Sequence, residues 1–202
     1  MISFTDKRFL FSISASLFLC FTCIYYIYIN STPFPYWDMW DGNVNFVAEF
    51  MKTGDWNLLL QQHNEHRIVI TKLLFLLDEI AFGGNYISLY FWNAIFPFIF
   101  LALYISSLAK CINIQKNIIF VILAFGVVFS LIQYDNYKWA FQSQFFLAFL
   151  VPFGAYYSWS LYNKSSKTIF LIATFLLLIA SSGTMANGLF ATIPLLFLEL
   201  IS

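Results

Sequence analysis

The sequence predicts an all-α integral membrane protein, a bundle of about six transmembrane helices with amphipathic interfacial helices in its first outer loop. Hydrophobic residues make up 61% of the 202 residues and charged residues only 10%, a balance far outside that of soluble domains. Several apolar stretches approach or exceed the roughly 20 residues that a helix needs to cross a membrane. Basic and acidic residues are equal in number, 10 of each, so there is no basic surplus to bind nucleic acid.

The first span is predicted over residues 9–30, which follow Lys7 and Arg8 and contain no charged residue. This stretch is too long for the apolar part of a signal peptide, and no small-residue cleavage site follows it, so we interpret it as an uncleaved anchor. Further charge-poor stretches predict five more spans, at 86–108, 117–134, 145–162, 168–182 and 188–202.

The distribution of cations predicts that the N-terminus is cytoplasmic, because lysine and arginine are retained on that side of a membrane. In this orientation six of the ten cations are cytoplasmic, namely Lys7, Arg8, Lys110, Lys116, Lys164 and Lys167. Eight of the ten acids then lie outside, seven of them in the outer loop 31–85. Residue usage rich in Phe, Ile, Asn and Lys suggests a bacterial inner membrane.

Residues 66–82 are apolar enough to be mistaken for a span but carry Arg67, Lys72, Asp78 and Glu79. A charge near the centre of a membrane helix costs roughly 2.5–3.5 kcal/mol on insertion scales. A span here would also reverse every later loop against the charge bias. We therefore expect an amphipathic helix that lies in the membrane interface.

The outer loop concentrates polar side chains beside a medium of low dielectric constant, where charges interact strongly. Asp41 stands where a helix N-cap is expected, and Gly54 where that helix would stop. If residues 63–78 are helical, His63, Arg67, Thr71 and Asp78 share one face, which can hold a phosphate. The loop is thus the expected reaction site, with Asp38, Asp41, His63, Glu65, His66 and Arg67 as its polar cluster.

The order of these segments resembles that of the membrane-embedded GT-C glycosyltransferases, which use polyprenyl-phosphate-linked sugars. The shared order is a first span, an outer loop that opens with an acid (here YWDMWDG), two surface helices, and a glycine-containing turn into the second span (here QQHNEHRIVITKLLFLLDEIAFGGN). Where many relatives have a His-Pro-Pro-Leu-like stretch, this chain has HNEHRIVI, without the prolines. The resemblance covers nearly the whole chain as a single GT-C-like transmembrane domain, residues 1–202.

The resemblance implies transfer of a sugar from a polyprenyl-phosphate-linked donor to a cell-envelope glycan or lipid acceptor at the outer face of the membrane. A carboxylate suits the role of general base toward the acceptor hydroxyl, and donor or positive groups suit the departing phosphate. The implied catalytic residues are Asp38 and, second, Asp41, for which a helix-cap role is the alternative. The implied phosphate partners are Arg67, His66, Lys72, His63 and Lys138.

No cofactor is expected. The stretch HNEHR lacks the H-E-x-x-H pattern of zinc sites and offers no obvious third ligand, so a divalent metal has no support in the sequence. Besides the lipid-linked donor and the acceptor, membrane lipids are the expected partners.

Two alternatives to an active enzyme remain open. A flippase or transporter subunit for lipid-linked sugars predicts charged residues inside the spans, and only Glu199 meets that description. An inactive, truncated remnant is the second alternative, because the chain ends in its sixth predicted span whereas GT-C proteins usually have more.

Overall fold

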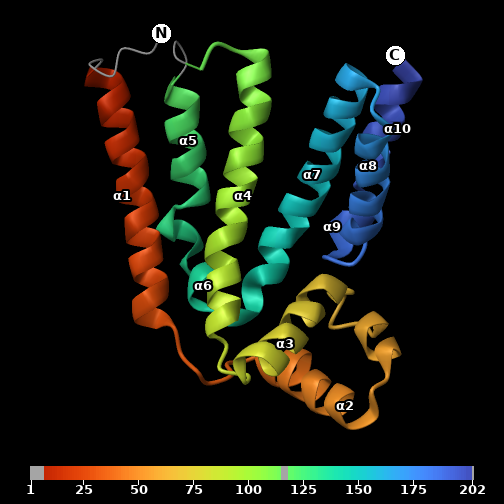
Figure 1. Cartoon of the computed structure of the whole chain (residues 1–202). Coiled ribbons are helices and arrows are strands. Elements are labelled where there is room, and N and C mark those ends of the chain that lie inside the picture. Colours follow the sequence, from red (N-terminus) through yellow and green to blue (C-terminus); the bar gives the residue numbers. More distant parts are fainter. Residues whose placement is uncertain (1–6, 115–117, 202) are drawn as a thin grey trace.

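The computed structural model describes residues 7–114 and 118–201, which form helices and turns without a β-strand. The main helices stand side by side, and the beginning of the first and the end of the last lie at the same end of the bundle (Figure 1). The all-α prediction is therefore confirmed for the described residues. The bundle helices are α1 (Lys7–Asn30), α4 (Ile87–Cys111), α5 (Ile118–Val128), α7 (Ser143–Ser165), α8 (Thr168–Ser181) and α10 (Thr192–Ile201).

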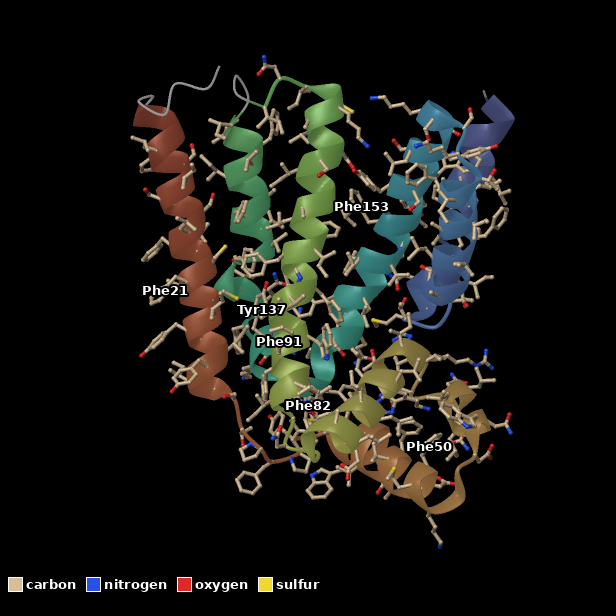
Figure 2. The ribbon with its side chains drawn as sticks, viewed as in Figure 1. Phe21, Phe50, Phe82, Phe91, Tyr137 and Phe153 are labelled. Atoms are coloured by element: carbon tan, nitrogen blue, oxygen red, sulfur yellow. The ribbon has the colours of Figure 1, made fainter. Side chains whose placement is uncertain are left out.

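Four helical segments are long and apolar enough to cross a membrane: Leu10–Asn30, Ile87–Cys111, Ile118–Lys138 and Ala140–Ser165. Their outward faces are apolar, as α1 illustrates with Phe11 70% exposed and Phe21 66% exposed. Figure 2 shows Phe21 pointing away from the neighbouring helices. Exposed phenyl rings in such number suit contact with lipid rather than water, and the chain is consistent with a multi-pass membrane protein.

The last two predicted spans correspond to shorter apolar helices, so the predicted count of six is not confirmed. α8 has 14 residues and extends about 21 Å, less than the roughly 30 Å thickness of a hydrocarbon core. Its C-terminal end meets the first outer loop, where the Ile70 backbone N–H donates to the Gly183 carbonyl at 3.2 Å. The predicted span 188–202 is divided between α9 (Ala186–Leu189) and α10.

The outer loop folds into a π-helix η1 (Trp40–Asn45), α2 (Phe46–Thr53), a 3₁₀ helix η2 (Trp56–Leu60) and α3 (Val69–Phe82). α2 and α3 lie beyond the end of the bundle and run across its helices (Figure 1). Gly54 ends α2 with a left-handed φ of 67°, as predicted. The interfacial position of α2 and α3 in a membrane stays a prediction.

Two local predictions in this loop are wrong. Asp41 is not an N-cap, because the π-helix already begins at Trp40; its carboxylate instead accepts from the Asn45 side chain at 3.0 Å. The second helix begins only at Val69, since His63 and His66 pair with each other in an extended turn. His63 and Arg67 therefore do not share a helix face with Thr71 and Asp78.

The segment from α5 to α7 shows how an interrupted helix satisfies its backbone. α5 stops at Val128, and the chain continues through η3 (Leu131–Gln133), α6 (Tyr134–Lys138) and η4 (Ala140–Gln142). The Val128 carbonyl accepts hydrogen bonds from the Tyr137 hydroxyl and the Gln133 side-chain amide. These side chains replace the missing backbone donor, which an apolar environment without water requires.

A buried carboxylate fixes the junction between α3 and α4. Asp78 is 1% exposed and accepts from the Tyr86 backbone N–H at 3.0 Å and from the Ser88 hydroxyl at 2.5 Å. Both donors lie at the beginning of α4, so Asp78 supplies the cap that no α4 residue provides.

We expect Asp78→Ala to lower the free energy of unfolding by about 1–3 kcal/mol, because it removes this cap and leaves buried donors without an acceptor. Thermal unfolding of the purified protein in detergent measures the change. Glu79→Ala is the control, since the neighbouring acid is exposed. Equal melting temperatures of the two variants would contradict a capping role for Asp78.

Candidate functional site

A polar cavity of about 570 Å³ lies where three chain segments meet at the end of the bundle that carries α3. Its volume is typical of small-ligand sites, which span roughly 300–1,000 Å³. The first segment is the outer loop, the second is the turn between α6 and α7, and the third is the turn between α8 and α9. The lining residues are Asp38, His63, Asn64, Glu65, His66, Trp139, Gln142, Gln144, Phe145 and Met185.

Asp38 enters the cavity from the turn that precedes η1. Its backbone carbonyl accepts a hydrogen bond from the Gly42 N–H at 2.8 Å. Its half-buried side chain lines the cavity. Gly42 is required here because a Cβ would lie 2.6 Å from the Phe141 ring and 2.9 Å from Cε1 of His63. The missing side chain lets the first and second segments approach closely.

The two histidines are brought together by a tight turn. The backbone groups of His63 and His66 exchange hydrogen bonds of 2.8 and 3.0 Å, and Asn64 adopts a left-handed φ of 50° between them, which asparagine tolerates better than most residues. Residues opposite each other in an antiparallel bridge direct their side chains to the same face. Both imidazoles thus line the cavity.

His66 also connects the outer loop to the third segment. Its Nδ1 accepts from the Ala186 backbone N–H at 3.4 Å. An imidazole that accepts at Nδ1 and is neutral carries its proton on Nε2. His66 therefore has a donor left for a ligand.

The second segment is held by hydrogen bonds to neighbouring elements. Asn93 of α4, fully buried, donates from Nδ2 to the Trp139 carbonyl at 2.9 Å. The Trp139 indole N–H donates to the Tyr36 carbonyl at 3.1 Å, and its ring stacks on Trp37 with centroids 5.9 Å apart. The loop after the first span is thereby joined to the turn before α7.

The surroundings of His63 favour its neutral form. Burial lowers the pKa of His63 below its ordinary value of 6.5, the nearby Asp38 charge opposes that shift, and Lys72 adds to it. The ring packs edge-on against Phe141, with centroids 5.2 Å apart. Among the residues that the structure describes, no lysine or arginine lines the cavity, whereas Asp38 and Glu65 do.

Of the seven predicted site residues, the structure brings Asp38, His63 and His66 together. Asp41 and Arg67 are exposed, and neither lines the cavity. Lys138 lies on α6, where its ammonium pairs with Asp135 at 2.8 Å. Gln142, Gln144 and Met185 were not among the predicted site residues. The two polar amides in the aromatic-rich stretch YKWAFQSQFF could have indicated the first two.

Lys72 has a structural position. It is 3% exposed, its Nζ donates to the carbonyls of Leu58 and Gln61 at 2.8 Å each, and it lies over the Phe46 ring at 5.0 Å. Burial lowers its pKa. These contacts join α3 to η2 and α2, so the ammonium organises the outer loop instead of facing the cavity.

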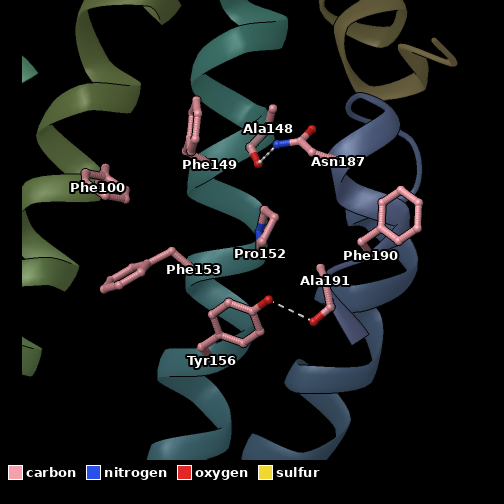
Figure 3. A pocket seen from close by; sticks show the side chains of 9 residues that line it. All are labelled: Phe100, Ala148, Phe149, Pro152, Phe153, Tyr156, Asn187, Phe190 and Ala191. Atoms are coloured by element: carbon pink, nitrogen blue, oxygen red, sulfur yellow. Dashed lines mark hydrogen bonds between the residues drawn. The ribbon is translucent and has the colours of Figure 1, made fainter. Parts of the chain in front are cut away.

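Two apolar grooves begin one turn farther along α7. One, of about 260 Å³, lies between α4, α5 and α7, and the other, of about 320 Å³, between α4, α7 and α9. Phe100 and Phe149 border both grooves. Figure 3 shows the second groove, with Phe149 and Phe153 extending from α7 toward Phe100 of α4.

Pro152 explains how α9 is held beside this groove. Proline has no backbone N–H, so the carbonyl four residues earlier, that of Ala148, lacks its helical donor. Asn187 of α9 donates to that carbonyl at 3.3 Å, and the Tyr156 hydroxyl donates to the Ala191 carbonyl at 2.9 Å (Figure 3). The carbonyl that Pro152 leaves without a helical donor thus binds the third segment to α7.

No family model, curated protein or solved structure shows significant similarity to this chain. Among the described residues, no group of three or more His, Cys, Asp or Glu side chains is arranged to hold a metal ion.

His63 predicts a pH dependence of stability. Because its pKa is lower in the folded chain, the unfolded chain binds the proton first, and stability present above pH 6.5 is lost as the pH falls below that value. Melting temperatures of the native chain and of His63→Gln at pH 8 and pH 5.5 test this. We expect a smaller decrease in His63→Gln, and equal decreases in the two proteins would contradict the assignment.

We expect Lys72→Met to destabilise the folded chain by about 2–3 kcal/mol, because two carbonyls lose a charged donor. Lys52→Met is the control, since Lys52 is an exposed lysine on α2. Thermal unfolding of both variants measures the difference. Unchanged stability of Lys72→Met together with weaker binding of a lipid phosphate would instead assign Lys72 to phosphate recognition.

Proposed function

We propose that the chain transfers a sugar from a polyprenyl-phosphate-linked donor to a cell-envelope glycan or lipid acceptor. In this proposal the six apolar segments lie in a bacterial inner membrane, with α8 and α10 shorter than its hydrocarbon core and with the N-terminus in the cytoplasm. α2 and α3 lie in the outer interface, and the polar cavity opens at the outer face. Six of the ten lysines and arginines belong to the segments at the end of the bundle opposite α2 and α3, and this distribution supports the orientation.

The observation that carries the proposal is the position of a polar cavity directly beside apolar grooves on one helix. Gln144 and Phe145 of α7 line the cavity, and Phe149, one turn later, borders both grooves. An amphiphilic substrate needs this arrangement, because its polar head requires hydrogen-bonding groups whereas its hydrocarbon part gains by apolar contact. A sugar linked through phosphate to a polyprenyl chain has both parts.

Asp38 is the proposed general base. Its carboxylate lines the cavity, and no lysine or arginine is among the described lining residues to form an ion pair with it. In the transfer, the acceptor hydroxyl oxygen bonds to the anomeric carbon while its proton moves to Asp38. The bond from that carbon to the phosphate oxygen breaks, and its electron pair stays on the phosphate.

The histidines are the proposed donors to the departing phosphate. His66 retains a donor at Nε2 when neutral, and a hydrogen bond to developing negative charge lowers the barrier. Arg67 follows directly in the chain and is exposed, which suits contact with a phosphate at the cavity edge. The assignment of Asp41 to catalysis, and of Lys72 and Lys138 to substrate binding, gains no support from their positions.

The test is sugar transfer by the purified chain in proteoliposomes that contain radiolabelled polyprenyl-phosphate sugars. We expect Asp38→Asn to lower the rate about 10²–10⁴-fold, the usual contribution of a general base. Asp55→Asn is the matched control, because Asp55 is an exposed acid whose capping bond to the Asn57 N–H an asparagine also makes. An equally active Asp38→Asn variant would exclude Asp38 as the base, and absence of transfer by the native chain would contradict the proposed function.

A further inference from the structure

Two glutamines that line the cavity have buried side-chain oxygens. Gln142 is 5% exposed and Gln144 is 6% exposed, and Oε1 of each has no hydrogen-bond partner among the described residues. A buried acceptor without a partner costs roughly 1–3 kcal/mol of stability, and most buried polar side chains in folded proteins are paired. Both side chains line the same cavity, so a ligand held there can supply the partner that the described residues do not.

The chemistry of the amides restricts what that partner is. Each amide offers one acceptor and two donors, which matches a hydroxyl, itself a donor and an acceptor. An ammonium ion uses only the oxygen, and an anion uses only the nitrogen. Several hydroxyl groups on one ligand satisfy both glutamines together with Asp38 and the histidines.

An aromatic surface borders the same cavity. Trp139 lines it and stacks on Trp37, with the ring planes 21° apart, while Trp37 remains 71% exposed. The Trp139 ring also stacks against Phe141, with centroids 5.5 Å apart, so its faces are covered by other side chains of the protein. Trp139 is therefore an apolar wall of the cavity, and recognition of hydroxyl groups falls to the two glutamines.

We infer that Gln142 and Gln144 form a subsite that recognises the hydroxyl groups of a neutral sugar. This inference rests on the proposed function and identifies which residues select the sugar unit. It separates recognition, on the second segment, from catalysis by Asp38 on the first. No lysine or arginine is among the described lining residues, and Asp38 and Glu65 are, which favours an uncharged sugar over an anionic one.

The test measures sugar binding by saturation-transfer NMR on the full chain in detergent micelles. The probes are the methyl glycosides of glucose, galactose, mannose and N-acetylglucosamine, with methylammonium, which donates hydrogen bonds, as the cationic comparison. We expect the native chain to bind at least one glycoside, and Gln142→Leu and Gln144→Leu each to weaken that binding about tenfold, the effect of losing one hydrogen bond. Gln62→Leu, at an exposed glutamine outside the cavity, should bind as the native chain does.

Melting temperatures distinguish recognition from a structural role. Because each leucine replaces an amide whose oxygen lacks a partner, both variants should melt at or above the native temperature, whereas a structural role predicts lower values. The inference is overturned if the leucine variants bind sugars normally, if they lose binding and melt lower, or if only methylammonium binds. Sugar binding by a native chain that transfers nothing would uphold the subsite and refute the transferase proposal.

Discussion

Trp139 lies where the three segments of the candidate site are joined. Its carbonyl accepts from Asn93 of α4 and its indole donates to the Tyr36 carbonyl, so one residue connects the second span, the loop after the first span, and the turn into α7. On its other side the ring stacks against Phe141, with centroids 5.5 Å apart, and Phe141 contacts both His63 and Phe75. The position of the histidines therefore depends on a residue far away in the sequence, and the cavity forms only when the bundle brings these segments together.

A second constraint is that backbone groups inside the bundle must find their hydrogen-bond partners within the protein. Where α5 stops, Tyr137 and Gln133 satisfy the Val128 carbonyl. Where Pro152 of α7 lacks a backbone N–H, the Asn187 side chain donates to the Ala148 carbonyl. The donors come from η3, α6 and α9, which adjoin the segments that line the cavity. The same hydrogen bonds that satisfy the irregular backbone therefore also position the site.

Sequence reasoning predicted the features that depend on local composition. The four long apolar helices and the left-handed stop at Gly54 followed from hydropathy and turn chemistry, whereas the choice of Asp38 followed from the resemblance to GT-C glycosyltransferases. The sequence-based prediction of a helix was wrong for the stretch HNEHR. There His63 and His66 exchange backbone hydrogen bonds and form a turn, although the neighbouring residues favour a helix. The burial of Lys72 could not be predicted from the sequence either, because the fold of the loop determines that the carbonyls of Leu58 and Gln61 are its partners. Gln142 and Gln144 join Asp38 only through tertiary structure, which residue spacing does not encode.

Under the proposed function, the charge of the cavity constrains how the lipid-linked sugar is held. Two carboxylates line the cavity, and burial lowers the pKa of His63, so a phosphate placed deep inside would meet like charge at short range, where the low dielectric constant strengthens repulsion. The sugar, which is uncharged and rich in hydroxyl groups, suits the interior beside the two glutamines. The phosphate is better accommodated at the edge, near His66 and the exposed Arg67, with the hydrocarbon chain along α7. The proposal thus gives proton transfer to Asp38 and stabilisation of the phosphate to donors at the edge, on opposite sides of the bond that breaks.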